Sequence, residues 1–252
     1  MIYSEPCNVR FSDFNRNGVL SYEGIFRAFE SVAVHHSDAV DENMFDATRE
    51  GRAWIITTWR IHVDRFPTYE EAETLTCETW TYAEKPRATS NRFYVIKDGT
   101  GNEIIQGWAV FALLNIGTQK LLRFTPEILD RYQPELRRLF EGERSVRLRP
   151  LPEYTDTLPL QVRRTDIDYN EHVHNISYMN YALEALTEED FTTDAVRDIR
   201  IFFGAQVRYG DDVTLCWTRS ADDETNVRHY DIAVKADGLP ACLLRLSTGE
   251  NP

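Results

Sequence analysis

The sequence predicts an α+β protein made of two similar halves, each with a helix followed by antiparallel strands. Three observations predict this class. Each half opens with an extended polar segment that runs into a helical pattern, and four strand-like runs follow each helix. Both sets of strands contain an Asp-Gly hairpin signal, at Asp98-Gly99 and Asp237-Gly238. A chain of 252 residues is long enough to bury two cores of ordinary size.

The first half begins with an extended segment, 8–15, and a turn at Asn17-Gly18. A helical pattern follows, in which four residues share one face: Ile25, Phe29, Val32 and His36. The strand-like runs are 53–63, 72–82, 90–96 and 103–115. A long helix followed by four antiparallel strands fits a unit whose sheet wraps the helix, so the helix is buried nearly all round.

The second half repeats this order, with an extended segment at 160–164 and a helix from about 175 to 186. Its strand-like runs are 199–208, 213–219, 227–234 and 241–247. An alignment of Asp13 with Asp166 also pairs Asn15 with Asp168, Asn17 with Asn170 and Val19 with His172. We interpret the halves as diverged copies of one unit. Because only the second copy keeps a histidine, we expect one active site per chain.

Between the halves lies a proline-containing segment with helical patches, so we expect units at 1–120 and 151–252 joined by a helical connector at 121–150. The whole chain carries a net charge of −13, which disfavours nonspecific binding to nucleic acid or to anionic membranes. The stretch from Lys120 to Arg149, however, holds eight basic and five acidic residues. A solvated linker helix is the common interpretation of such a stretch, and docking of an acidic partner is the functional alternative.

No apolar run approaches the roughly 20 residues that cross a bilayer. The first residues, Met1-Ile-Tyr-Ser-Glu-Pro6, show no secretory signal, so we expect a cytoplasmic protein. The four cysteines (Cys7, Cys77, Cys216, Cys242) form no C-x-x-C pair, which predicts buried, unreactive thiols rather than a zinc site or disulfides.

Polar residues recur at every second position just before the second helix. Alternation along an extended segment predicts that Asp168, Asn170 and His172 lie on one side of the chain. His172 is the candidate general acid or base; Asp168 could orient it, act as base or attack a carbonyl; Asn170 could donate its amide or hold water. The N–H groups near Asn175 and Ile176 are candidate oxyanion donors. Turn formation and helix capping, with Asn175 as the N-cap, are the structural alternative.

The run Asp166-Ile-Asp-Tyr-Asn-Glu-His-Val-His-Asn-Ile-Ser-Tyr178 resembles the D-x-D-x-N-x-H-V-N-N-x-x-Y signature of acyl-acyl-carrier-protein (acyl-ACP) thioesterases. The resemblance extends to 54–67, Glu78-Thr-Trp80 and Arg92-Phe93 in the first half. It implies a tandem (double) hotdog fold, with the acyl pocket in the first half and Asp168, Asn170 and His172 in the active site. The implied reaction is hydrolysis of fatty acyl-ACP to free fatty acid in fatty acid biosynthesis, with neither metal nor organic cofactor.

The chain departs from the family pattern at two positions. His174 stands where the family usually has Asn, a change that a helix start tolerates. Gln206, in Gln206-Val-Arg-Tyr-Gly-Asp211, stands where family members carry a Glu on the strand after the helix. A glutamine cannot act as base or nucleophile, although it can position water. Either Asp168 carries the chemistry, or activity is low, or the alignment is shifted here.

The resemblance implies acyl carrier protein as the partner, for which Arg137 and Arg138 are the candidate docking residues. We expect no nucleic-acid partner, and a homodimer is compatible with the sequence. Three alternatives stay open: an acyl-CoA thioesterase, a hotdog dehydratase, and a hotdog that binds acyl thioesters without turnover.

Two further patterns favour structural interpretations. The run from Asp13 to Gly24 is close to an EF-hand loop, but Gly24 takes the place of the twelfth-position glutamate, so we attribute the match to chance. His35 and His36 end the first helix, where the helix dipole favours a cationic imidazole.

Overall fold

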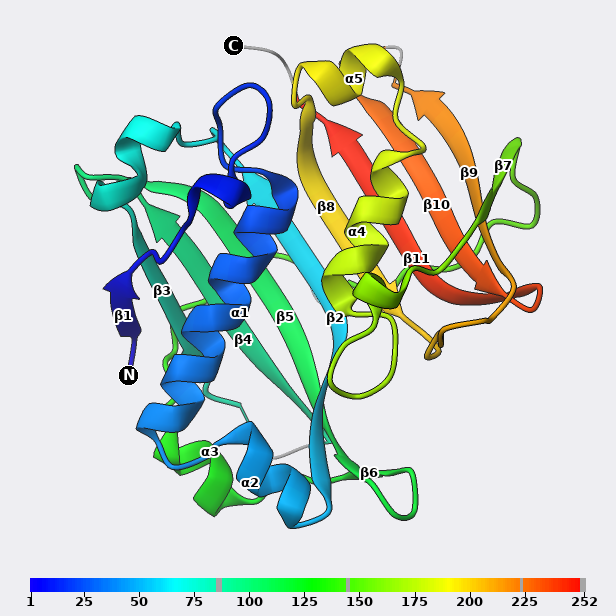
Figure 1. The fold of residues 1–252 in the computed structure, drawn as a ribbon. Helices are drawn as coiled ribbons and strands as arrows, with labels where there is room; N and C mark the ends of the chain where they lie inside the picture. Colours follow the sequence, from blue (N-terminus) through cyan, green and yellow to red (C-terminus); the bar gives the residue numbers. More distant parts are fainter. Residues whose placement is uncertain (85–87, 144–145, 223, 250–252) are drawn as a thin grey trace. The chain divides into compact units, whose positions relative to one another are not determined.

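The structure is a computed structural model of the chain and describes all residues except 85–87, 144–145, 223 and 250–252 (Figure 1). Its contacts divide the chain into two compact units. Unit 1 comprises Met1–Trp59 and Val63–Arg144, and unit 2 comprises Arg60–His62 and Ser145–Pro252. The part of the expected connector before residue 145 therefore folds with unit 1, and its last residues fold with unit 2.

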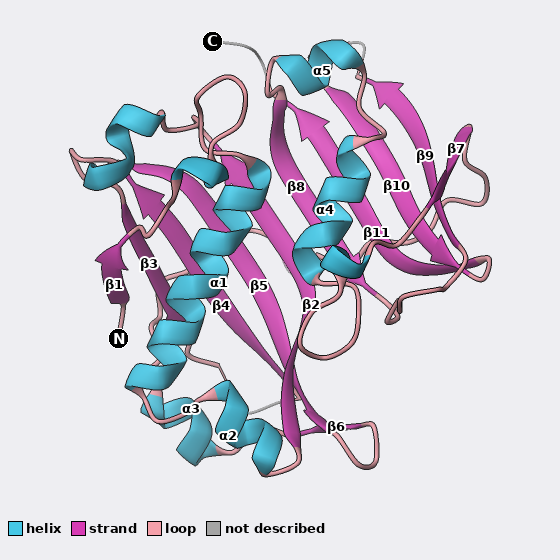
Figure 2. Cartoon of the chain, in the orientation of Figure 1, coloured by secondary structure: helices cyan, strands magenta, loops and turns pink. Residues whose placement is uncertain are grey.

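Unit 1 consists of a sheet crossed on one face by the long helix α1 (Tyr22–Ala39) (Figure 2). Its strands follow the order β1-β3-β4-β5-β2, and β6 pairs with β5. The strands are β1 (Tyr3–Pro6), β2 (Arg52–Val63), β3 (Thr76–Thr81), β4 (Thr89–Lys97), β5 (Glu103–Asn115) and β6 (Lys120–Leu122). Two short helices complete the unit, α2 (Met44–Arg49) and α3 (Pro126–Arg131).

Helix α1 starts where Ser21 caps it, since the Ser21 Oγ accepts the Gly24 N–H at 3.0 Å. Ile25, Phe29 and Val32 are fully buried, which confirms the apolar face expected for this helix. Phe29 packs on Tyr94 of β4 with ring centroids 4.9 Å apart. The sheet of unit 1 therefore packs on the helix through large aromatic side chains.

One strand of unit 1 starts later than expected. The 72–82 run begins with a 3-10 helix, Tyr69–Thr74, and only then continues as β3. Glu71 accepts the N–H of Thr68 at 2.8 Å and pairs with Arg65, so a local capping interaction holds the turn against the strand pattern.

Unit 2 repeats the arrangement, with α4 (Asn175–Leu183) across one face of a sheet and α5 (Glu188–Thr192) after it (Figure 2). Its strand order is β8-β11-β10-β9-β7. The strands are β7 (Asp156–Leu160), β8 (Val196–Phe203), β9 (Val213–Ala221), β10 (Arg228–Ala236) and β11 (Leu239–Thr248). Helix α4 ends three residues before the expected position, because the chain turns there into α5, capped by Thr187.

Strand β8 ends at Phe203, five residues before the end of the predicted run. The N–H groups of Gly204 and Ala205 both donate to the carbonyl oxygen of Ala241, at 2.8 and 2.9 Å, so the chain leaves the ladder there. The residues after this bend, Gln206 included, lie in a loop instead of the expected strand.

Two expectations from the sequence concern titratable groups that the structure buries. All four cysteines are free and buried, as expected, and burial raises the pKa of the Cys77 and Cys242 thiols. The expectation of a cationic His36 is wrong. Burial, followed by the charge of Arg92, lowers the pKa of His36 to about 3, so its imidazole is neutral. Within the described part of the chain, no helix is long and apolar enough to cross a membrane.

Candidate active site

The signature segment folds into a closed turn, and the prediction of an extended segment with three side chains on one side is wrong. The Asp168 N–H donates to the His172 carbonyl at 2.8 Å. The Asp168 Oδ1 accepts the N–H groups of Asn170 at 2.8 Å and of His172 at 3.4 Å. Glu171 completes the turn in the left-handed region, with a φ of 63°. Such a carboxylate, bonded to backbone two residues ahead, is typical of an Asx-turn.

The turn brings Asp168 and His172 together at its base. Both are half-buried, whereas Asn170 is exposed at the tip. The His172 Nε2 is buried and has no hydrogen-bond partner among the described residues. A buried imidazole nitrogen without a partner is costly in a core but suited to a proton donor or acceptor that awaits a substrate.

Helix α4 follows the turn directly. His174 occupies the N-cap position and makes no side-chain cap, so the prediction that Asn175 is the N-cap is wrong by one residue. The N–H groups of Asn175 and Ile176 have no acceptor in the described part of the chain, as the first N–H groups of a helix generally do not. These two donors therefore keep the role of candidate oxyanion donors.

The loop after β8 runs beside the turn, because the Val173 N–H donates to the Val207 carbonyl at 2.8 Å. Gln206 immediately precedes that contact and is exposed, with no side-chain hydrogen bond to any described residue. The backbone around Gln206 is thus held at the base of the turn, while its side chain is free to meet solvent or a substrate.

The contacts of Asp166 were not predicted from the sequence. Its side chain is buried, and its Oδ2 accepts the Arg163 N–H and the Tyr181 hydroxyl, each at 2.7 Å. Burial and this hydrogen bond raise the pKa of Tyr181. The repeated Arg-x-x-Asp spacing, Arg10 to Asp13 and Arg163 to Asp166, is the signal that could have revealed a buried acceptor at this position.

Unit 1 contains the same turn without the imidazole. The Asn15 N–H donates to the Val19 carbonyl at 2.9 Å, and the Asn15 Oδ1 accepts the N–H groups of Asn17 and Val19 at 2.9 and 3.4 Å. Gly18 takes the left-handed position, with a φ of 71°. The two turns match residue by residue, which supports the alignment of the halves and leaves His172 as the imidazole of the pair.

The expected docking arginines lie in unit 1 and have partners there. Arg137 pairs with Glu103 at 2.5 Å and lies over the Trp80 ring at 4.6 Å. Arg138 lies over the Trp108 ring at 5.5 Å. Both are half-buried, so a carrier protein that used them would compete with contacts within this unit.

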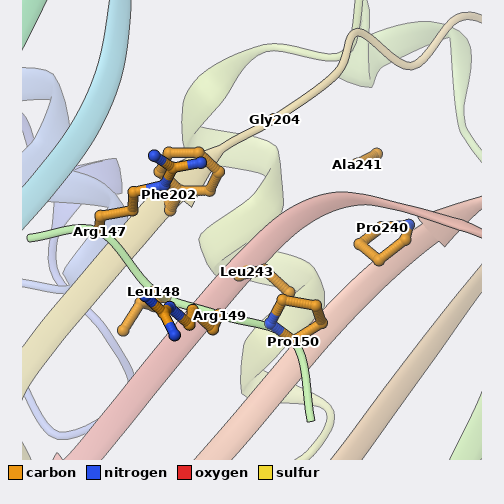
Figure 3. A pocket seen from close by; sticks show the side chains of 9 residues that line it. All are labelled: Arg147, Leu148, Arg149, Pro150, Phe202, Gly204, Pro240, Ala241 and Leu243. Carbon is orange, nitrogen blue, oxygen red and sulfur yellow. The ribbon is translucent and has the colours of Figure 1, made fainter. Parts of the chain in front are cut away.

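A cavity of about 390 Å³ lies in unit 2, and Figure 3 shows the residues that line it. It is lined by Arg147, Leu148, Arg149, Pro150, Phe202, Gly204, Pro240, Ala241 and Leu243. Phe203 contacts Tyr178 of α4. Phe202, the preceding residue of β8, points to the opposite face of the sheet, as does its cross-strand partner Leu243. The cavity therefore lies on the sheet face away from α4. It includes none of the predicted site residues.

The described residues contain no group of three or more His, Cys, Asp or Glu side chains arranged to hold a metal ion. The EF-hand-like segment of unit 1 instead uses Asp13 internally, since its Oδ2 accepts the Arg10 N–H at 2.7 Å.

Comparisons with known proteins agree with this architecture. The family model for the acyl-ACP thioesterase N-terminal domain matches residues 1–132, and that for the C-terminal domain matches residues 151–243. The chain belongs to the acyl-ACP thioesterase family. It is 27% identical to oleoyl-acyl carrier protein thioesterase 2, chloroplastic, of Arabidopsis thaliana over 88% of this chain. The match spans only 64% of that relative's length.

Two solved structures show the same fold. An acyl-ACP thioesterase from Bacteroides thetaiotaomicron superposes with a TM-score of 0.78 at 18% identity, covering 98% of this chain and 96% of the other. The 12:0-ACP thioesterase from Umbellularia californica gives 0.82 at 14% identity, covering 98% and 93%. These similarities confirm the predicted hotdog fold.

Proposed function

We propose that this protein hydrolyses fatty acyl-ACP to a free fatty acid and holo-carrier protein. The observation that carries the proposal is the unpartnered His172 Nε2, held by a closed turn directly before a helix whose first N–H groups lack acceptors. A proton-transfer group and oxyanion donors within four residues of each other are what acyl transfer to water requires. Membership of the acyl-ACP thioesterase family supports the choice of thioester.

In the proposed reaction, water adds to the thioester carbonyl and the C–S bond breaks. His172 takes a proton from the attacking water and returns it to the leaving sulfur, which departs as the thiol of the carrier's phosphopantetheine arm. The N–H groups of Asn175 and Ile176 stabilise the charge on the carbonyl oxygen.

The other candidate residues have supporting roles in this proposal. Asp168 holds the His172 backbone through its Oδ1 and leaves its second oxygen for the substrate or water. Asn170 at the exposed tip and Gln206 in the neighbouring loop hold the attacking water through their amides.

Thiol release from acyl-ACP and acyl-CoA tests the proposal. We expect wild-type turnover with acyl-ACP, and a loss of about 100-fold or more in kcat for His172→Ala, because general acid–base catalysis contributes 10²–10⁴-fold. Asp168→Ala should lose activity as well. A wild-type protein that cleaves neither thioester would contradict the proposal.

Gln206 favours a second candidate, a hotdog that binds acyl thioesters without turnover, because an amide cannot replace the family's carboxylate as a base. The same assay separates the two functions. A gain of turnover in Gln206→Glu over a weakly active wild type would show that the amide limits catalysis. Binding without cleavage, unaffected by His172→Ala, would establish the second function.

Other features of the proposed function stay predictions. They are the preference for acyl-ACP over acyl-CoA, the exclusion of a hotdog dehydratase, the acyl pocket in unit 1, the homodimer and the cytoplasmic location. The curated Arabidopsis relative is named as chloroplastic.

A further inference from the structure

Unit 2 contains contacts around its turn that the matching turn of unit 1 lacks. In both units the buried aspartate before the turn accepts two N–H groups. The Asp13 carbonyl accepts the Ser21 N–H at 2.9 Å, and the Asp166 carbonyl accepts the His174 N–H at 2.8 Å. The carboxylates accept the N–H of Arg10 and of Arg163, both at 2.7 Å. These contacts form the shared frame of the turn.

Among the described residues, two contacts occur in unit 2 that have no counterpart in unit 1. The Tyr181 hydroxyl donates to the Asp166 Oδ2 at 2.7 Å, and the Ser177 hydroxyl donates to the Asp166 carbonyl at 3.4 Å. The positions that match Ser177 and Tyr181 in unit 1 are Gly24 and Ala28, which have no hydroxyl.

The packing in unit 1 explains why Gly24 cannot be a serine there. A Cβ at Gly24 would lie 2.6 Å from the Asp13 carbonyl oxygen. The start of α1 therefore packs against the Asp13 backbone with no side chain at position 24. In unit 2 the helix instead meets the turn through two side-chain hydroxyls. Unit 2, which carries the imidazole, therefore adds two side-chain hydrogen bonds from its helix to Asp166, beyond the backbone hydrogen bond that both units share.

We propose that Asp166 is a positioning residue that, through Tyr181 and Ser177, holds the Asp168–His172 turn in register with the N-terminus of α4. Asp166 is 8% exposed and is not among the residues proposed to contact the substrate. It therefore acts on catalysis by positioning the backbone that carries His172 and the two N–H donors. Small displacements of a catalytic group are costly, since about 1 Å of misplacement can lower the rate by about 10²-fold. The catalytic part of this inference rests on the proposed hydrolysis.

The experiment compares Asp166→Ala and Tyr181→Phe with Asp13→Ala, the matched control in unit 1. We expect kcat for acyl-ACP to fall by about 100-fold in Asp166→Ala and by about 10-fold in Tyr181→Phe, with KM little changed. Asp13→Ala should lower the melting temperature but keep kcat near the wild-type value. Asp166→Asn should recover most of the kcat that Asp166→Ala loses, because one amide oxygen can accept both the Arg163 N–H and the Tyr181 hydroxyl.

Amide hydrogen exchange gives a second readout that needs no turnover. We expect the amides of Asp168 and His172 to exchange faster in Tyr181→Phe, while those of Asn17 and Val19 in the unit 1 turn keep their wild-type rates. Unchanged exchange in the unit 2 turn overturns the inference, whether or not the wild type hydrolyses thioesters. Faster exchange of these amides in Tyr181→Phe, together with kcat values for Asp166→Ala and Tyr181→Phe equal to that of Asp13→Ala, also overturns it. Failure of the wild type to cleave any thioester would instead count against the proposed function, and exchange then decides the positioning role alone.

Discussion

A single side-chain oxygen shapes the turn that carries His172. The Asp168 Oδ1 accepts two backbone N–H groups, and Asn15 does the same in unit 1 with an amide oxygen. A neutral oxygen is therefore sufficient to fold the turn. The turn does not require the negative charge of the Asp168 carboxylate, which is consistent with a chemical role for that charge.

The left-handed residue of each turn gives a test of this backbone geometry. Glu171 has a φ of 63°, a conformation that costs an L side chain about 1–2 kcal/mol, whereas Gly18 holds the same position without that cost. We expect Glu171→Gly to raise the free energy of unfolding by up to about 1 kcal/mol, since the added freedom of glycine in the unfolded chain offsets part of the gain.

The reciprocal change, Gly18→Glu, is the control. A Cβ at Gly18 would meet nothing within 4 Å, so only its φ opposes the substitution, and we expect a loss of about 1 kcal/mol. Denaturant unfolding measures both changes. Destabilisation by Glu171→Gly would show that the Glu171 side chain contributes more than its strain costs.

At the scale of elements, hydrophobic periodicity predicted the helices and strands well because burial imposes that periodicity. Strand β5 coincides with its predicted range, and the buried face of α1 is the expected one. The errors lie where local polar contacts override the pattern. The capping interaction at Thr68 delays β3, and the bend at Gly204 shortens β8.

The sequence nominated the residues of the candidate site, but it did not predict their geometry. The polar pattern before the second helix and the resemblance to the family signature singled out Asp168, Asn170 and His172. Alternation then placed them on one side of a strand, whereas backbone acceptors close the segment into a turn. The contact between Asp166 and Tyr181 joins residues 15 apart through a helix, so no local pattern predicts it.

Close packing between α1 and its sheet is testable at Gly107 of β5. A Cβ there would lie 2.7 Å from the Phe29 ring, which is fully buried under α1. We expect Gly107→Ala to lower the free energy of unfolding by about 1–3 kcal/mol, the usual cost of overpacking a core.

Gly117→Ala is the matched control for this change, because its new Cβ would approach only the Asn115 side chain, at 3.6 Å. Equal unfolding free energies for the two variants would show that the Phe29 ring moves aside without cost. Denaturant titration of both variants decides between these outcomes.

For the whole molecule, the repeated order of helix and strands predicted two units, of which only the second keeps a histidine at the matched position. The basic stretch from Lys120 to Arg149 contrasts with the net charge of −13, which repels other acidic proteins in general. A carrier protein that docks on this chain must therefore find local positive charge. Arg137 and Arg138 remain our proposal for this charge, although a carrier protein that bound them would compete with their contacts in unit 1.

Charge reversal tests this docking with two donors. We expect Arg138→Glu to raise KM for acyl-ACP several-fold and to leave KM for acyl-CoA unchanged, because acyl-CoA lacks the carrier's protein surface. Arg137→Glu should also lower the melting temperature, since it loses the Glu103 ion pair and the Trp80 ring. Equal effects on both donors would point to a change in folding rather than in docking.

The burial of every native thiol has a practical consequence. Alkylating reagents react with exposed thiolates, and Cys7, Cys77, Cys216 and Cys242 are all buried in the folded chain. Tyr169 is 60% exposed beside the turn tip. A cysteine introduced at Tyr169 could thus be labelled with a fluorophore in the unmodified cysteine background. Its emission would then report the arrival of a ligand at the turn in real time, in a protein that needs no prior removal of its own thiols.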